Sequence, residues 1–183
     1  MPADRGTELF QLVDRAGTPT GAASRQECHG NPALIHLVIH CHVLDPAGRL
    51  LLQKRSRSKD TNPGRWDTSV GGHVSAGEPV RVALLREARE ELGLDATASV
   101  ALYSYLWEGS FESEYARCFL LETGEPARPD AQEIDELRAF TLEEVQGMIG
   151  TGSLTPMFEY EWPRLLGALR SRSPGGQRGG TSE

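Results

Sequence analysis

Alternating apolar and polar positions predict several strands in this 183-residue chain. The clearest case is residues 36–44, where Leu37, Ile39, Cys41 and Val43 fall on one face and three histidines fall on the other. A period of two is typical of a strand whose two faces meet different surroundings. Similar patterns predict further strands at residues 50–54, 100–107, 114–121 and 137–140.

The most regular helical pattern follows Pro79, which suits the first position of a helix, and ends before Gly93, which suits its C-terminal cap. Four apolar residues share one side of this helix: Leu84, Leu85, Ala88 and Leu92. Two later helices are predicted at residues 142–149 and 158–169. Because strands and helices interleave, the sequence predicts an α/β fold. One domain is expected over residues 1–170, and the polar, glycine-rich residues 171–183 are predicted to be disordered.

Composition narrows the classes of function. The chain is 38% hydrophobic and 25% charged, and it lacks a run of the roughly 20 apolar residues that cross a bilayer. The N-terminal residues include acidic side chains where a signal peptide would have an apolar run. This composition predicts a cytoplasmic protein without a membrane partner. A net charge of −7 disfavours binding to a nucleic acid polymer. A small phosphorylated ligand remains compatible with this charge if a divalent cation accompanies it.

Three carboxylates on the first predicted helix are candidates for metal binding. Glu87, Glu90 and Glu91 stand at i, i+3 and i+4, and therefore occupy an arc of about 100° on the helix surface. Mg²⁺ prefers such oxygen ligands and usually bridges them to substrate phosphates. The same pattern is also typical of a solvated acidic face that neighbouring arginines neutralise. The spacing alone leaves both interpretations open.

The residues around these carboxylates resemble the Nudix box. Gly72 is followed after five residues by Glu78, and after seven more by Arg86-Glu87-Ala88-Arg89-Glu90-Glu91-Leu92-Gly93-Leu94. The resemblance implies a Nudix fold, with a mixed β-sheet sandwiched between α-helices, and metal-dependent hydrolysis of a diphosphate bond. It assigns Mg²⁺ or Mn²⁺ to Glu87, Glu90, Glu91 and the main-chain carbonyl of Gly71. It also makes Arg86 the residue that orients the carboxylates.

Hydrolysis requires a carboxylate that accepts a proton from the attacking water. Glu91 and Glu90 are the candidates within the box. Some Nudix family members use a glutamate on a later loop, and Glu133 occupies a similar place here. Gly71 and Gly72 are expected to let the backbone approach a metal or phosphate closely and to adopt positive φ.

A second resemblance is to isopentenyl-diphosphate isomerase. It rests on His29 and His36, on the segments 56–59, 63–66 and 69–73, and on Glu112-Ser113-Glu114. In that enzyme a catalytic cysteine precedes a Gly-His pair, whereas this chain has Gly71 at that position. A glycine side chain cannot exchange a proton with carbon, so this departure favours hydrolysis over isomerisation.

The isomerase resemblance also implies a second metal site. Its ligands match in type and approximate spacing at His29, His36, His73, Glu112 and Glu114. Mixed nitrogen and oxygen donors suit Zn²⁺ or Mn²⁺ better than Mg²⁺. The alternative is a set of hydrogen-bonded or solvated side chains.

A basic segment is a candidate for holding the substrate diphosphate. Its members are Lys54, Arg55, Arg57, Lys59 and Arg65, and both lysine and arginine pair with phosphate oxygens. A solvated loop with no ligand would have the same composition.

Three functions remain open at this point. The first is a hydrolase acting on a nucleoside diphosphate-linked or other organic diphosphate. The second is an isomerase acting on a prenyl diphosphate, and the third is a non-catalytic nucleotide-binding module. The complete carboxylate set disfavours the third, because a binding module does not need it. The expected partner is a small-molecule diphosphate, and by analogy with the Nudix family a homodimer is also expected.

Overall fold

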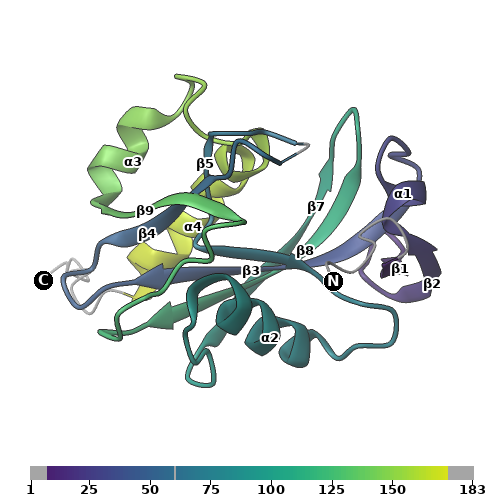
Figure 1. Ribbon diagram of the computed structural model, residues 1–183, viewed down its shortest axis with the longest axis horizontal. Helices are drawn as coiled ribbons and strands as arrows, with labels where there is room; N and C mark the ends of the chain where they lie inside the picture. Colours follow the sequence, from purple (N-terminus) through teal and green to yellow (C-terminus); the bar gives the residue numbers. More distant parts are fainter. Residues whose placement is uncertain (1–7, 60, 173–183) are drawn as a thin grey trace, which may run out of the picture.

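The computed structural model describes residues 8–59 and 61–172 and shows one mixed sheet with helices on both faces (Figure 1). Its strands are β1 (Leu9–Val13), β2 (Pro19–Ser24), β3 (Ile35–Leu44), β4 (Leu50–Arg55), β5 (Trp66–Asp67), β6 (Val70–His73), β7 (Val100–Glu108), β8 (Ser113–Glu122) and β9 (Ile134–Phe140). Its helices are α1 (Arg25–Cys28), α2 (Val80–Leu92), α3 (Leu142–Met148) and α4 (Pro156–Arg172). The predicted α/β fold, a mixed sheet between helices, is confirmed.

Strand β3 is the centre of the sheet. Along one edge it runs parallel to β8 over its whole length. Along the other edge it is antiparallel to three strands in turn. It pairs with β1 at His36, with β6 from Val38 to Cys41, and with β4 at Val43 and Leu44. Beyond its pairing with Val43 and Leu44, β4 leaves β3 and pairs with β5 and β9. The sheet therefore divides between β4 and β6.

The two faces of the sheet meet different hydrophobic layers. Leu37, Ile39, Cys41 and Val43 of β3 pack with the buried side of α2, as the alternation along β3 predicts. Phe158, Trp162 and Leu165 of α4 pack in a second layer with leucines of β4. Figure 1 accordingly shows α2 and α4 on opposite faces of the sheet. Because a fully buried leucine or phenylalanine contributes about 1.5–3 kcal/mol relative to exposure, both helices are firmly held.

Helix α2 begins and ends close to its predicted limits. Pro79 is the residue before the first helical residue, with extended backbone angles, so the helix begins one position later than expected. Gly93 ends the helix with φ of 65°, and its N–H donates to the carbonyl of Arg89 at 3.0 Å. Glycine adopts this left-handed conformation without a steric penalty, which explains why the helix stops there.

Several short elements were not predicted. Among them are β2, β5, β6 and α1. The expectation of positive φ at Gly71 and Gly72 is wrong, because both are residues of strand β6 and neither has positive φ. Glycines weaken the signal of a strand, so only the pairing with β3 reveals this one. Helix α4 runs to Arg172, two residues past the expected domain end. The rest of the predicted tail lies outside the described residues.

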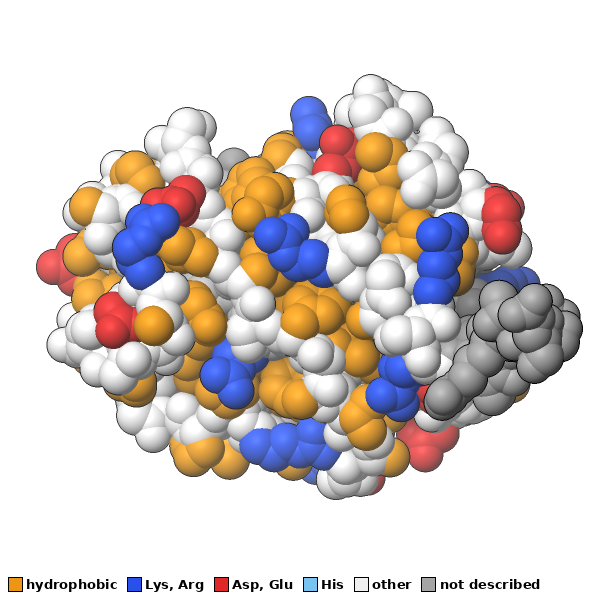
Figure 2. All heavy atoms as spheres, turned by 180° about the vertical axis from the view of Figure 1, so that it is seen from behind, with side chains coloured by type: hydrophobic (Ala, Val, Ile, Leu, Met, Phe, Trp, Pro, Cys, Tyr) orange, Lys and Arg blue, Asp and Glu red, His pale blue; other side chains and the backbone are white. Residues whose placement is uncertain are grey.

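Figure 2 shows the reverse face of the molecule, where lysine and arginine side chains lie singly among apolar ones. Within the described residues, no helix has both the length and the apolar character needed to cross a membrane.

The packing of α2 gives the first testable prediction. Leu84 is fully buried between α2 and the sheet, whereas Val82 on the same helix is 50% exposed. Leu84→Ala should lower the free energy of unfolding by about 2–5 kcal/mol through lost burial and a residual cavity. Val82→Ala should change it by less than about 0.5 kcal/mol. Urea unfolding of both variants measures the difference, and equal effects would contradict this packing.

Candidate active site

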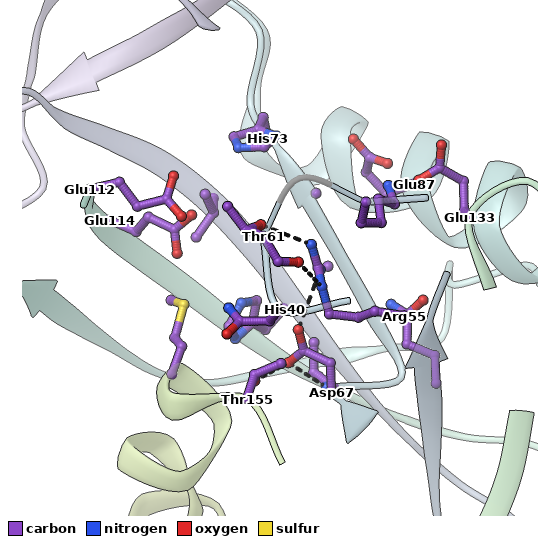
Figure 3. Close-up of a pocket in the computed structure, with 18 of the residues that line it drawn as sticks. His40, Arg55, Thr61, Asp67, His73, Glu87, Glu112, Glu114, Glu133 and Thr155 are labelled. Atoms are coloured by element: carbon purple, nitrogen blue, oxygen red, sulfur yellow. Dashed lines mark hydrogen bonds and ion pairs between the residues drawn. The ribbon is translucent and has the colours of Figure 1, made fainter. Parts of the chain in front are cut away.

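A cavity of about 780 Å³ opens where the sheet divides between β4 and β6 (Figure 3). Many of the residues singled out by the sequence line it, although they are widely separated along the chain. They are His29, Arg55, Lys59, Gly71, His73, Arg86, Glu87, Glu90, Glu91, Glu112, Glu114 and Glu133. The fold therefore assembles most of the predicted site in one place.

Two of the three carboxylates of α2 are turned away from solvent. Glu91 is 9% exposed and the side chain of Glu87 is 14% exposed, whereas that of Glu90 is 61% exposed. Glu91 accepts hydrogen bonds from the N–H of Gly71 at 3.1 Å and from the amide of Gln53 at 3.2 Å. Burial raises the pKa of Glu91 to about 8, helped by the charge of Glu87. Burial also raises the pKa of Glu87 to about 7. A cation between such carboxylates would relieve their repulsion.

Arg86 connects the carboxylates of α2 to the preceding loop. Its guanidinium nitrogens lie 2.7 Å from Glu87 and 3.3 Å from Glu90. It also donates two hydrogen bonds to Glu78, at 2.9 and 3.0 Å, and one to the carbonyl of His73 at 3.0 Å. Charge-assisted bonds of this kind hold carboxylates in fixed directions. The geometry is therefore suited to the orienting role predicted for Arg86.

The glycines of β6 are required for close approach and not for positive φ. A Cβ atom at Gly72 would overlap the carboxylate of Glu87. At Gly71 it would lie 3.2 Å from Cγ2 of Thr68 and 3.7 Å from Cδ2 of His40. Glycine at position 72 therefore gives Glu87 the space in which it faces the cavity.

A second cluster of candidate ligands lies on the other side of the cavity, where Figure 3 labels His73, Glu112 and Glu114. The register of β3 and β8 sets His36 beside Glu114. Ligand atoms of His36, His73 and Glu114 lie within 4.8 Å of one another. His29 joins them through a 3.3 Å contact between its Nε2 and Oε2 of Glu112. The five residues predicted as a second metal site thus lie together.

The environment of this cluster suits a metal. Burial, followed by the charge of His36, lowers the pKa of His73 well below its usual range, which keeps this imidazole neutral. Burial also opposes protonation of His36, but its contacts with Cys28 and Glu114 raise the pKa of His36 to about 9. Neutral imidazole is the form that binds metals, so a cation bound here would have to displace the proton of His36. His36 is fully buried, and neither of its ring nitrogens makes a hydrogen bond of good geometry within the described residues, although Nε2 lies 3.3 Å from Glu114. Buried polar atoms normally have such partners, so this arrangement fits a coordination site.

The predicted phosphate-binding residues separate into two groups. Arg55 and Lys59 line the cavity, where Arg55 donates to the carbonyl and hydroxyl of Thr61 and Lys59 forms an ion pair with Glu133. Contrary to the sequence-based expectation, three residues of the basic segment are absent from the lining: Lys54, Arg57 and Arg65.

These three residues make contacts elsewhere. Lys54 neighbours Arg55 on β4, where successive side chains point to opposite faces, and it lies 5.6 Å over the ring of Trp66. The backbone N–H of Arg57 is bound to Asp135, and the Arg65 guanidinium donates to the carbonyl of Leu154.

Comparison with known protein families agrees with this geometry. The family model described as the NUDIX domain matches residues 34–158, which contain α2, Gly71 and most of the cavity lining. The chain belongs to the NUDIX family.

Relatives of this NUDIX chain carry a specific name. Isopentenyl-diphosphate Delta-isomerase of Brevibacterium linens is 34% identical over 148 residues, which are 78% of this chain and 81% of the relative. The protein of the same name from Kocuria rhizophila is 37% identical over 142 residues, 74% of this chain and 79% of the relative. Among solved structures, DR0079 from Deinococcus radiodurans has a TM-score of 0.76 at 24% identity, covering 86% of this chain and 98% of that one. The family resemblance and the NUDIX fold are confirmed.

One buried network at the floor of the NUDIX cavity was not predicted. Glu161 of α4 is fully buried and accepts hydrogen bonds from His40 at 2.7 Å, His42 at 2.8 Å, Tyr105 at 3.1 Å and Tyr103 at 2.9 Å. Burial opposes its ionisation, but the charges of His40 and His42 lower the pKa of Glu161 well below its usual range. Burial likewise opposes protonation of His40, but Glu161 raises the pKa of His40 to about 9. The alternation of β3 placed both histidines on one face, yet nothing in the sequence linked them to Glu161.

The close approach at Gly72 gives a prediction. Gly72→Ala should displace the Glu87 carboxylate and weaken Mn²⁺ binding by about tenfold or more, in the range seen when residues that orient ligands are changed. Isothermal titration calorimetry with Mn²⁺ measures it. Gly147→Ala is the matched control, because a Cβ at Gly147 meets nothing within 4 Å. Unaltered Mn²⁺ affinity in Gly72→Ala would show that Glu87 is not a ligand.

Proposed function

We propose that this NUDIX chain is a metal-dependent hydrolase that cleaves the phosphoanhydride bond of an organic diphosphate. The observation that carries the proposal is the convergence of the Glu87 and Glu91 carboxylates on Gly71 and Gly72, with both pKa values raised by burial. Like charges held together away from water are unfavourable in a resting protein and become favourable around a divalent cation. Stability alone gives no reason for this arrangement.

The residues present fit Mg²⁺ or Mn²⁺. Glu87, Glu90, Glu91 and the carbonyl of Gly71 offer oxygen donors only, which is the chemistry that these hard cations prefer. The bound cation would neutralise the diphosphate oxygens and make a water molecule easier to deprotonate. Arg86 keeps Glu87 and Glu90 aimed at the site through its ion pairs.

Three candidates for the general base line the cavity: Glu90, Glu91 and Glu133. Glu91 is held by Gly71 and Gln53, and burial raises its pKa to about 8. Glu133 lines the same cavity and is paired with Lys59. We favour Glu91, because Glu133 is paired with Lys59 and Glu90 with Arg86.

The substrate diphosphate is proposed to bind between α2 and the cations of the opposite wall. Arg55 and Lys59 from the basic segment line the cavity, and Arg25 joins them. Guanidinium groups bind phosphate oxygens in pairs, and lysine acts as a point charge. When an anionic substrate enters, these cations would offset its repulsion by the acidic side chains of the lining.

A second metal is proposed at His29, His36, His73, Glu112 and Glu114. Three imidazoles and two carboxylates favour Zn²⁺ or Mn²⁺. The neutral state of His73 and the lack of well-formed hydrogen bonds to His36 support this assignment.

Isomerisation of a prenyl diphosphate is the second candidate function, because the curated relatives carry that name. Two features of this chain disfavour it. Gly71 stands where the isomerase resemblance requires a catalytic cysteine. All three cysteines, Cys28, Cys41 and Cys118, are buried, and none of them lines the cavity.

A substrate panel distinguishes the two reactions. Nucleoside diphosphates, nucleoside triphosphates, nucleotide sugars and isopentenyl diphosphate would be tested with Mg²⁺ and Mn²⁺, following both phosphate release and isomer formation. Metal-dependent release of phosphate or pyrophosphate is expected. Isomer formation without release would replace the hydrolase by the isomerase, and lack of turnover on every substrate would favour a binding module.

Glu91→Gln is the sharpest variant for this function. Glutamine preserves the shape of the side chain but can neither accept a proton nor balance the charge of a cation. Turnover should fall by at least about a hundredfold, while the melting temperature stays close to that of the wild type. Glu122→Gln, at an exposed end of β8, is the control. Undiminished turnover in Glu91→Gln would remove this carboxylate from the mechanism.

The second metal site has its own test. Glu114→Gln should remove about one equivalent of bound Zn²⁺ or Mn²⁺ per chain, because an amide is a much poorer metal ligand than a carboxylate. Metal content after dialysis measures the change, with Glu122→Gln on the same strand as control. Equal metal content in both variants would contradict this site.

A further inference from the structure

A buried glutamine lies where β4 passes from the layer packed on α2 to the cavity. Leu51 of this strand packs with the layer that holds the buried side of α2, and Arg55 lines the cavity. Gln53 stands between them on the same face, because strand side chains alternate, and it is 5% exposed. Burying an amide costs free energy unless its polar atoms find partners. An apolar side chain would pack here without that cost, so the amide at position 53 requires an explanation.

The partner of this amide is Glu91. Nε2 of Gln53 donates to Oε2 of Glu91 at 3.2 Å, and the N–H of Gly71 donates to the same oxygen at 3.1 Å. The amide nitrogen is the atom that faces Glu91, because the amide oxygen would set two acceptors against each other. Gln53 belongs to β4 and Gly71 to β6, the two strands between which the sheet divides. One oxygen of Glu91 is thus bound from both sides of this division.

The other oxygen of Glu91 is left for a ligand. Within residues 8–59 and 61–172, no group donates a hydrogen bond to Oε1 of Glu91, while the side chain lines the cavity. The last torsion of a glutamate side chain is normally broad, so its two oxygens exchange places readily. Two donors on Oε2 remove this freedom and leave Oε1 as the oxygen that is available in the cavity.

Arg86 does not perform this task for Glu91. Its guanidinium pairs with Glu87 and Glu90, and it forms no ion pair with Glu91 in the described part of the chain. A neutral amide and a guanidinium both orient a carboxylate, but the guanidinium adds a positive charge that opposes binding of a cation. Gln53 therefore orients Glu91 without weakening the attraction between this carboxylate and a divalent ion.

We propose that Gln53 is a positioning residue of the α2 site: by binding Oε2 of Glu91, it holds Oε1 in the direction in which Glu91 serves the divalent cation and the attacking water. The N–H of Gly71 contributes to the same orientation, but a main-chain donor does not depend on the residue type. Gln53 is thus the side chain that sets the orientation of Glu91. The consequence for turnover rests on the proposed hydrolase function, whereas the consequence for metal binding requires only that the α2 carboxylates hold a cation.

Gln53→Met tests this role, because methionine has the length of glutamine and lacks its donor. Oε2 of Glu91 keeps the N–H of Gly71, so no acceptor is left unpaired and the melting temperature of the metal-free protein should stay close to that of the wild type. Mn²⁺ affinity in calorimetry and kcat should both fall by about tenfold or more, the usual range when the hydrogen-bond partner of a metal ligand is removed. Gln53→Leu, which packs differently, should give the same losses.

A double-mutant cycle with Glu91→Gln separates positioning from a purely structural role. Because Gln53 acts through Glu91, Gln53→Met should change Mn²⁺ affinity by less than about twofold once Glu91→Gln is present. The proposed second metal site is the same in all four proteins and cancels in this comparison. Equal losses in the two backgrounds would overturn the proposal. So would Mn²⁺ affinity and kcat that stay within about twofold of the wild type in both Gln53→Met and Gln53→Leu.

Gln146→Met is the matched control. Gln146 accepts a hydrogen bond from the indole N–H of Trp162 at 2.8 Å and does not line the cavity. Its replacement should lower the melting temperature more than Gln53→Met does, because the indole of Trp162 loses its acceptor. Mn²⁺ affinity and kcat of Gln146→Met should stay within about twofold of the wild type. A control that loses Mn²⁺ affinity as Gln53→Met does would also overturn the proposal.

Calorimetry without substrate keeps this inference apart from the proposed function. A wild type that binds Mn²⁺ but hydrolyses no diphosphate would overturn the hydrolase, and the Mn²⁺ affinities of the four proteins would still decide the role of Gln53. Wild-type turnover that is insensitive to Gln53→Met, together with unchanged Mn²⁺ affinity, would overturn only this role. A wild type that binds no Mn²⁺ would overturn both.

Discussion

The register of β3 against its neighbours is the constraint on which the site depends. His36 lies opposite Glu114 of β8, Val38 opposite His73 of β6, and His40 opposite Gly71. Because strand side chains alternate with a period of two, a slip of one residue would move every histidine of β3 into the layer packed against α2. The apolar residues of β3 prevent such a slip, since their burial under α2 fixes which face is which. Packing on one face thereby aligns the chemistry on the other.

The division of the sheet turns this register into a cavity. Strand β4 pairs with β3 only at Val43 and Leu44, and β6 takes its place from Cys41 to Val38. Side chains from α2, β3, β4, β6 and β8 then reach one space. The carboxylates of α2 face the histidine–glutamate cluster across it, and His40 forms part of the floor (Figure 3). Carboxylates and histidines, which a compact apolar core would exclude, are held together by the two apolar layers around them.

Burial shifts the pKa values of several ionisable groups in this cavity. Burial raises the pKa values of Glu87 and Glu91 and lowers that of His73. In each case the shift moves the group towards its neutral form, as expected where water is scarce. Bound cations and a phosphorylated ligand would offset this cost of burying ionisable groups. We therefore assign the unfavourable burial to function. Two buried pairs depart from this pattern, because in each of them a carboxylate and an imidazole stabilise one another's charge. They are Glu161 with His40 and Glu114 with His36.

Sequence alone determined the features that depend on local periodicity and on a contiguous motif. The strand at β3, the helix α2 with its glycine end, the α/β class and the carboxylates at i, i+3 and i+4 follow from residues that lie close together in the chain, and the box resemblance gave the family. Tertiary structure decided the rest. The strand nature of Gly71 and Gly72, the exclusion of Lys54 from the cavity and the link from His40 to Glu161 depend on pairing and packing between distant segments. Separations such as the 121 residues between His40 and Glu161 leave no periodic trace in a sequence, because such contacts are chosen by the whole fold and not by neighbouring residues.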